Sequence, residues 1–357
     1  MKIVFMGTPD FAAASLRALL DWPGGQVAAV YCQPDRPAGR GQALQTGPVK
    51  ALALERNLPV LQPENFRQPE ELERLAAFGA DIFVVAAYGL ILPKALLDLP
   101  PLGAINVHGS LLPEYRGAAP IQRAIMAGDI RTGISIMRVE PKLDSGPVLL
   151  QRAMAIGVDQ TAGELHDELA LLGGELLVQA LERMSQGRLT EQVQDENLVT
   201  YAAKLTKADG VLDFNLTARQ VHNQARGVTP WPGAQITFER LPLDQEKAPA
   251  KNQDLARPQG QAQTQPQSQI LPPIKALIEA GRVLVETGPT LSDFCSALAG
   301  TPYLPGTVLP LQDDCLPVVC ADGLYGIERL RPAGGKSMSA AAFANGYLKN
   351  CQAGAIW

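Results

Sequence analysis

The chain has 357 residues, a formal net charge of −5 and five cysteines. This length allows two domains, and the acidic balance argues against nucleic-acid binding over the whole surface, so any such contact must depend on local patches. With no CxxC pair and no apolar run long enough for a signal peptide or a membrane span, we expect a reduced, cytoplasmic protein.

The first half alternates between predicted strands and helices. Short apolar runs rich in β-branched residues predict strands, and apolar residues at helical spacing predict helices. In chain order these are strand 2–7, helix 11–21, strand 26–33, helix 48–58, strands 80–89 and 103–110, helix 120–129, strand 132–140 and helix 161–184. This alternation predicts an α/β fold with a mostly parallel sheet covered by helices on both faces, in which ligands bind beyond the carboxyl ends of the strands.

Three loops that follow predicted strands carry the candidate chemistry. The loop 86–93 has the glycine and apolar residues that suit a flat heterocycle. Asn106 and His108 stand two positions apart, so an extended backbone points both side chains to one face. Asp144 lies in the loop 141–147. By itself, LDSG around Asp144 is most often an ordinary Asx-type turn, and an isolated His108 is more often a structural histidine at a strand end.

Other sequence motifs give no support for further chemistry. The chain has no GxGxxG, no GxxxxGK[ST] and no HExxH, which disfavours dinucleotide, Walker-type phosphate and zinc binding. GTPD at 7–10 predicts a turn from a strand into a helix, with Asp10 near the helix start. His166 and His222 lie in unrelated segments, so we expect them to be structural or surface residues.

One motif set gives a specific resemblance. INVHGSLLPEYRGAAPIQRAI, with LDSGP about 36 positions after the histidine, resembles the catalytic core of the formyltetrahydrofolate-dependent formyltransferases. MGTPDFA, QPDRPAGRG, PVKALA, ARGVTPWPGA and LRPAGGKSMS, in this order along the chain, resemble the branch of that superfamily that acts on methionyl-tRNA. HGSLLP alone would indicate only the superfamily.

The resemblance implies a cytoplasmic enzyme of translation initiation, from a bacterium or an organelle of bacterial origin. It would transfer the formyl group of 10-formyltetrahydrofolate to the α-amino group of initiator methionyl-tRNA, without a metal or a covalent intermediate. We expect a monomer with no obligate protein partner and no membrane association.

The resemblance also implies the site residues. Asn106 and a protonated His108 would donate to the tetrahedral oxyanion, and Asp144 would accept the amine proton or orient the imidazole. A carboxylate beside a histidine favours the imidazolium form. The implied folate site comprises Tyr88, Gly89, Leu90, Ile91, Ser110, Leu111, Leu112 and Pro113. Ser110 equally fits an ordinary turn hydroxyl.

The second half has a different character. We expect a catalytic domain at 1–187, a linker at 188–206 and a second domain at 207–357. Short strands punctuated by proline and glycine predict a small β-barrel, which the resemblance identifies as an OB-like, tRNA-binding domain, and 274–288 predicts a helix followed by a strand. The Gln- and Pro-rich stretch near 244–270 is expected to be a disordered insertion.

The predicted tRNA contacts are few. From Lys204 to the end the chain has 14 Lys and Arg against 13 Asp and Glu, a balance of +1, whereas RNA-binding domains are usually clearly basic. The predicted contacts are Arg36 and Arg40 in the loop 33–47, and a patch that includes Lys204, Lys207, Arg226, Arg329, Arg331 and Lys336. A scattered, solvated set of charges is the alternative.

Three other functions remain open from the sequence. A sister enzyme could formylate a sugar-nucleotide amine or glycinamide ribonucleotide, although it should lack QPDRPAGRG and GAAPIQRA. A formylfolate hydrolase would use the same three polar residues with water. A non-catalytic RNA-binding module would have little reason to keep Asn106, His108 and Asp144 together.

Overall fold

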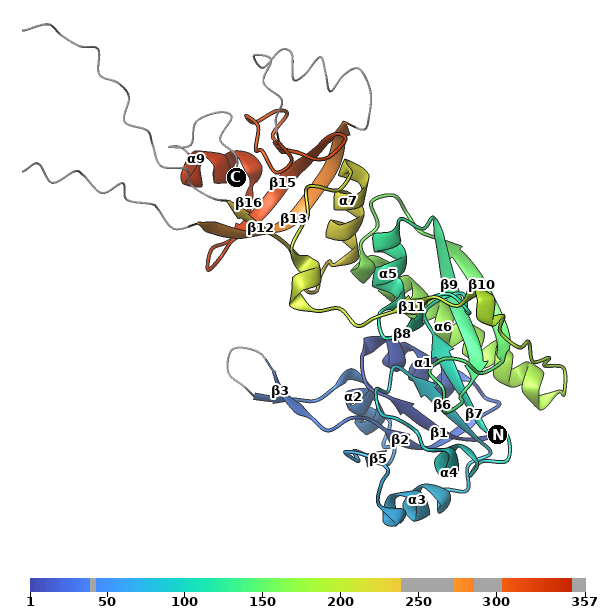
Figure 1. Ribbon diagram of the computed structural model, residues 1–357. Coiled ribbons are helices and arrows are strands. Elements are labelled where there is room, and N and C mark those ends of the chain that lie inside the picture. The colour runs from blue at the N-terminus through green and yellow to red at the C-terminus, as the bar shows by residue number, and fades with distance from the viewer. Residues whose placement is uncertain (39–42, 239–272, 286–303, 349–357) are drawn as a thin grey trace, which may run out of the picture. The chain divides into compact units, whose positions relative to one another are not determined.

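The computed structural model describes residues 1–38, 43–238, 273–285 and 304–348 (Figure 1). The chain forms two compact units, the first with residues 1–206 and 226–232 and the second with 207–225 and 233 onward. The stretch near 244–270, predicted to be a disordered insertion, and Arg40 lie outside the described residues. None of the described helices is long and apolar enough to cross a membrane.

The first unit is built on a seven-stranded sheet with the order β10-β9-β7-β6-β1-β2-β5. Its strands are β1 (Lys2–Gly7), β2 (Gln26–Tyr31), β5 (Val60–Leu61), β6 (Ile82–Ala86), β7 (Ala104–His108), β9 (Arg131–Arg138) and β10 (Val148–Ala155). Five strands run parallel, whereas β9 pairs antiparallel with both β7 and β10. The predicted α/β fold with a mostly parallel sheet is therefore confirmed. The sequence analysis missed both edge strands, β5, which has two residues, and β10, whose residues alternate between buried and exposed only in part.

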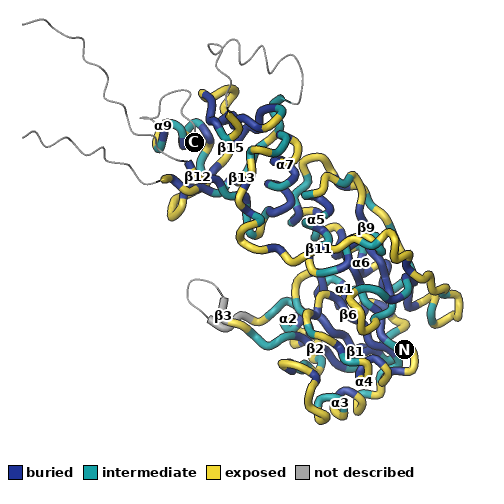
Figure 2. The backbone as a smooth tube through the Cα atoms, in the orientation of Figure 1, coloured by how far each residue is buried: buried dark blue, intermediate teal, exposed yellow. Residues whose placement is uncertain are grey.

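Helices cover both faces of this sheet, as predicted. The helices are α1 (Asp10–Asp21), α2 (Pro48–Glu55), α3 (Pro69–Ala76), α4 (Lys94–Leu97), α5 (Pro120–Ala127) and α6 (Ala162–Ser185). Successive residues of β1 point to opposite faces, so Ile3 packs in one core with α1, α2, α5 and α6, and Val4 packs in another with α3 and α4. Figure 2 shows β1 and β6 buried between these two layers.

Two short strand pairs and a single turn of 3-10 helix complete the first unit. β3 (Arg36–Ala38) pairs with β4 (Ala43–Gln45) inside the predicted loop 33–47. β8 (Arg116–Gly117) pairs in parallel with β11 (Tyr201–Ala202), and the turn η1 (Glu196–Leu198) precedes β11. Residues 188–206, expected as a linker, thus carry secondary structure that pairs within the first unit.

The described part of the second unit is an antiparallel sheet with the α-helices α7 and α9. Its elements are η2 (Lys207–Gly210), α7 (Ala218–Gly227), β12 (Ala234–Phe238), β13 (Ile274–Val285), β14 (Leu316–Val319), β15 (Leu324–Pro332), β16 (Met338–Ser339) and α9 (Ala340–Tyr347). The described strands follow the order β12-β13-β15-β14, with β16 on β15. Register shifts between β13 and β15 bend the sheet, as the predicted barrel-like domain requires.

The predicted helix at the start of 274–288 is wrong, because β13 is one continuous strand over Ile274–Val285. Ile274, Ala276 and Ile278 are buried and alternate with more exposed residues, which is the period of a strand. Pairing with β12 and β15 on its two sides outweighs the helical propensity of the Lys, Ala, Leu and Glu residues in this segment.

Helix α6 begins with a reciprocal capping box. The Thr161 hydroxyl accepts from the Glu164 backbone N–H at 3.3 Å, and the Glu164 carboxylate accepts from the Thr161 backbone N–H at 2.8 Å. We expect Thr161→Ala to lower the free energy of unfolding by about 1 kcal/mol, measured by urea denaturation at pH 7. Thr161→Ser is the control, and equal stability of the Ala and Ser variants would contradict the capping role.

The same capping box predicts a pH dependence. The hydrogen bonds from the Thr161 backbone and hydroxyl hold the pKa of Glu164 below its usual value. A carboxylate with a lowered pKa stabilises the fold fully above its ordinary pKa and loses that contribution as pH falls through the folded pKa. The stability difference between the unsubstituted chain and Thr161→Ala should therefore be smaller at pH 3 than at pH 7.

Candidate active site

A cleft of about 820 Å³ opens at the carboxyl end of the parallel strands of the first unit. Most of its lining comes from residues 87–92 after β6, 106–109 at the end of β7, and 140–144 after β9. Phe11 on α1, His166 on α6 and residues 117, 118 and 120–122 around the start of α5 also line it. The position agrees with the general rule that α/β sheets bind ligands beyond the carboxyl ends of their strands.

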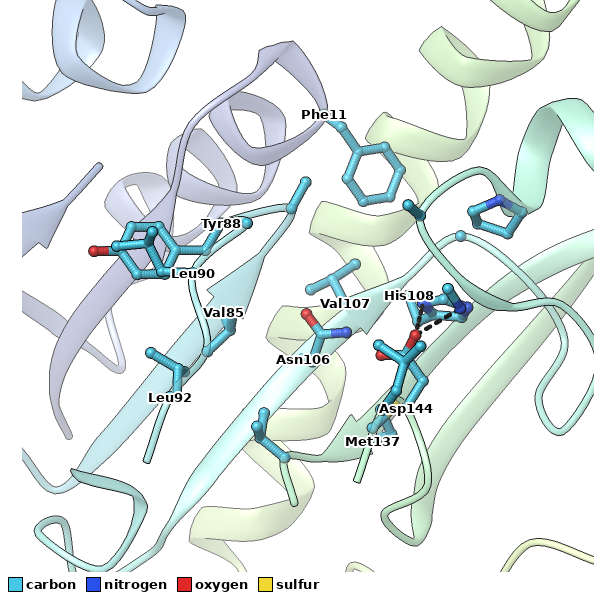
Figure 3. A pocket seen from close by; sticks show the side chains of 18 of the residues that line it. Phe11, Val85, Tyr88, Leu90, Leu92, Asn106, Val107, His108, Met137 and Asp144 are labelled. Carbon is cyan, nitrogen blue, oxygen red and sulfur yellow. Dashed lines mark hydrogen bonds and ion pairs between the residues drawn. The ribbon is translucent and has the colours of Figure 1, made fainter. Parts of the chain in front are cut away.

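Strand β7 brings Asn106 and His108 into this cleft. Ile105 and Val107 alternate with them and are buried in the core, and Val107 also lines part of the cleft. Figure 3 shows Asn106 between the apolar side chains around Tyr88 and the pair formed by His108 and Asp144. The prediction that Asn106 and His108 share a face follows from this two-residue period.

His108 is held by a single backbone acceptor. Its Nε2 lies 3.0 Å from the carbonyl oxygen of Tyr115, and because a carbonyl only accepts, Nε2 carries the proton in this contact. The other nitrogen, Nδ1, lies 3.8 Å from Oδ2 of Asp144, which is an ion-pair distance and too long for a hydrogen bond. Nδ1 is therefore the nitrogen available for chemistry.

Tyr115 has its own anchor. Its hydroxyl donates to Oδ2 of Asp129 at 2.7 Å, and its backbone N–H donates to Oγ1 of Thr200 at 2.8 Å. Burial and then the Asp129 hydrogen bond raise the pKa of Tyr115, so the hydroxyl keeps its proton. These contacts fix the carbonyl that orients His108.

Asp144 is fixed by its side chain and by its backbone. Its Oδ2 accepts from the backbone N–H of Gly117 at 2.8 Å, and its carbonyl oxygen accepts from Nε2 of Gln194 at 2.9 Å. Gly117 has φ +125°, and a Cβ there would lie 2.7 Å from the carbonyl oxygen of Ala202, so only glycine fits. Within the described part of the chain, Oδ1 of Asp144 accepts no hydrogen bond and remains available to a substrate.

The predicted folate residues separate into two groups. Tyr88, Gly89, Leu90 and Ile91 line the cleft, whereas Ser110, Leu111, Leu112 and Pro113 do not. The Ser110 hydroxyl is fully buried and donates to the carbonyl oxygen of Glu114 at 2.6 Å, which is the turn role weighed as its alternative. The apolar cleft wall is therefore supplied by the loop after β6.

The predicted tRNA contacts lie in both units. Arg36 is exposed on β3 and donates to Gln33 at 3.1 Å, and Lys204 is exposed in the first unit. In the second unit Lys207 and Lys336 are exposed, and Arg331 pairs with Glu279 at 3.1 Å.

The patch expected from the sequence loses one member. Arg226 is buried and donates to the carbonyl oxygens of Gly157 and Gln160, so it does not belong to an exposed patch. The sequence around Arg226 does not predict its burial, because the carbonyl acceptors come from residues 157–160, far away in the chain.

The sequence analysis missed two aromatic side chains in the cleft wall. Phe11 and His166 have ring centroids 5.8 Å apart, and the His166 Nδ1 lies 2.9 Å from Oδ1 of Asp167. His166 was expected to be structural or at the surface, and no local pattern distinguishes it because only the packing of α6 against α1 brings it to the cleft. His222 is buried in the second unit, as expected for a structural residue.

Comparison with known families assigns the chain. Residues 1–181 match the formyl transferase family, and residues 204–348 match the formyl transferase C-terminal domain. The chain belongs to the formyl transferase family. The family identification, which the sequence motifs predicted, is confirmed.

Several relatives of this formyl transferase are similar over nearly the full length. Methionyl-tRNA formyltransferase from Nitratidesulfovibrio vulgaris strain DP4 is 51% identical over 352 residues, which cover 99% of this chain and 94% of the relative. Methionyl-tRNA formyltransferase from Pseudomonas paraeruginosa is 42% identical over 356 residues, which cover 100% of this chain and 99% of the relative.

Solved structures share the fold of this formyl transferase at low identity. An N-formyltransferase from Helicobacter canadensis in complex with folinic acid and dTDP-3-aminofucose has a TM-score of 0.58 at 15% identity, covering 95% of this chain and 100% of that one. HypX from Aquifex aeolicus in complex with tetrahydrofolic acid has a TM-score of 0.54 at 16% identity, covering 98% of this chain and 48% of HypX.

The folate site predicted from the sequence can be tested separately on the residues that line the cleft and on those that do not. We expect Leu90→Ser to raise the Kd for folinic acid about tenfold, because it replaces apolar surface in the wall. Ser110→Ala should change this Kd less than about twofold, since its hydroxyl bonds within its own loop. Isothermal titration calorimetry measures both, with Ile130→Ser, an exposed apolar residue outside the cleft lining, as the control. A larger loss for Ser110→Ala than for Leu90→Ser would contradict this placement.

Proposed function

We propose that this enzyme transfers the formyl group of 10-formyltetrahydrofolate to the α-amino group of initiator methionyl-tRNA. The observation that carries the proposal is the convergence of Asn106, His108 and Asp144 in one largely apolar cleft. The names of the relatives that are 51% and 42% identical over nearly the whole chain support methionyl-tRNA as the acceptor.

The reaction makes one bond and breaks one. The amine nitrogen attacks the formyl carbon, the bond from that carbon to N10 of the folate breaks, and the proton lost by the amine is balanced by the proton gained at N10. Such a reaction needs donors for the oxygen that becomes negative and an acceptor for the amine proton. The cleft offers both kinds of group.

The three polar side chains divide this work. The amide of Asn106, and Nδ1 of His108 when the imidazole is protonated, donate to the developing oxyanion. Oδ1 of Asp144 is available to accept the amine proton, because Gly117 already bonds to Oδ2. The 3.8 Å between Nδ1 and Oδ2 supports this division, because a donor and an acceptor this close together can reach one reacting group.

Recognition of the tRNA falls to exposed cations. We propose that Arg36, Lys204, Lys207 and Lys336 contact its phosphates, and that Arg331 joins them by exchanging its Glu279 partner. Arg40, predicted to read the acceptor end, lies outside the described residues. The affinity for tRNA should therefore depend strongly on these charges.

Transfer of a radiolabelled formyl group from 10-formyltetrahydrofolate tests the acceptor. We expect formyl-methionyl-tRNA as the product, with much slower formate release to water and no transfer to free methionine. Transfer to a dTDP-aminosugar or to glycinamide ribonucleotide in preference to methionyl-tRNA would contradict the proposal, and so would formate release as the main reaction.

Single variants test the roles of the site residues. Asn106→Ala, His108→Ala and Asp144→Ala should each reduce kcat by about 10² to 10³, with a smaller effect on folinic acid binding, because their interactions strengthen in the transition state. His108→Ala combined with Asp144→Ala should lose less than the product of the two single losses. A full multiplicative loss would show that the two side chains act independently.

A further inference from the structure

The segment 192–202, here called the strap, follows α6 in the sequence and precedes the second unit. It forms hydrogen bonds with both loops that hold the side chains proposed to be catalytic. The backbone of Gln192 exchanges two hydrogen bonds of 2.8 Å with Val148, beside the Asp144 loop. At its other end, the carbonyl oxygen of Thr200 accepts from the Arg116 N–H at 2.9 Å, beside Tyr115 and Gly117. The strap therefore joins the loop that orients His108 to the loop that carries Asp144.

Gln194 is the buried side chain at the centre of the strap. Its Nε2 donates to the carbonyl oxygens of Asp144 at 2.9 Å and Gly146 at 2.7 Å. Its Oε1 accepts from Nε and Nη2 of Arg116 at 3.1 and 2.9 Å. Both amide hydrogens and both lone pairs are used, so the side chain has a single orientation.

The geometry of Asp144 explains why such a contact is needed. Asp144 has φ +45°, in the left-handed region of backbone conformation that residues other than glycine rarely adopt. A strained backbone of this kind persists only where its surroundings fix it. The two hydrogen bonds from Gln194 to the carbonyls at 144 and 146 supply that support directly at the strained turn.

Arg116 connects the same glutamine to His108. It is fully buried, and its backbone lies between Tyr115, whose carbonyl accepts from His108, and Gly117, whose N–H donates to Asp144. A hydrogen-bonded path therefore runs from His108 through residues 115 and 116 to Gln194, and from there to Asp144. Displacing Gln194 would change the separation of the two catalytic side chains.

We propose that Gln194 is a positioning residue for formyl transfer, which sets the separation of His108 and Asp144 by holding Arg116 and the Asp144 backbone at once. The proposal rests on the proposed function. It gives the strap a part in the chemical step in addition to connecting two units.

Two substitutions separate the contacts of Gln194. Gln194→Glu keeps the acceptor for Arg116 but has no amide donor for the carbonyls of Asp144 and Gly146. Gln194→Ala removes both contacts. Gln192→Glu and Gln192→Ala are the matched controls, since Gln192 is an exposed residue of the same strap whose side chain makes no hydrogen bond among the described residues.

The measurement is the single-turnover rate of formyl transfer at saturating 10-formyltetrahydrofolate and methionyl-tRNA. A misplacement of about 1 Å in a catalytic group can cost about 10² in rate, so Gln194→Glu and Gln194→Ala should lose about 10- to 100-fold. The KM for tRNA and the Kd for folinic acid should change less than about threefold. Formate release to water should fall in parallel with transfer, and both Gln192 controls should stay within about twofold.

Several outcomes would overturn the proposal. One is Gln194→Glu transferring at the full rate with an unchanged Tm, and another is a loss confined to the KM for tRNA, as expected of a strap that only connects the units. If Gln194→Glu does not fold, Gln194→Met replaces it, because methionine matches glutamine in length and lacks the amide donor. The same loss in transfer rate is then expected of Gln194→Met, with the same small changes in KM and Kd. Absence of transfer by the unsubstituted chain would instead overturn the proposed function.

Discussion

The pairing of β7 with a parallel strand on one side and an antiparallel strand on the other constrains the whole active site. β6 pairs Val85 with Asn106, and β9 pairs Ser135 with His108, so β7 cannot slip by one residue without burying its polar side chains in the core. The carboxyl end of β6 brings the apolar loop 87–92 beside Asn106. The turn after β9 returns Asp144 to the same edge.

The side chains proposed to be catalytic are held by backbone groups more than by one another. His108 donates to the carbonyl oxygen of Tyr115, and Asp144 accepts from the N–H of Gly117. The two neighbours of Arg116 in the sequence therefore fix the positions of His108 and Asp144. This arrangement leaves Nδ1 and Oδ1 free for the substrate. Direct bonding between the two side chains would have occupied Nδ1.

Burial and ion pairing reduce the charge that the surface can offer to RNA. Arg226 donates to backbone carbonyls and Arg331 forms an ion pair with Glu279. Arg116 is buried and donates to Gln194. A count of basic residues along the sequence therefore overestimates the cations available to a phosphate backbone.

The sequence by itself determined the α/β class, five of the seven strands of the main sheet, the helices α1, α2, α5 and α6, and the shared face of Asn106 and His108, because these depend on periodicities of two and 3.6 residues that local pattern records. It also carried the family resemblance. Only the tertiary structure decided that Ile274–Val285 is one strand, that Ser110 turns away from the cleft, and that residues 188–206 bind the catalytic loops. Each of these outcomes depends on partners far along the chain, and local sequence does not specify them.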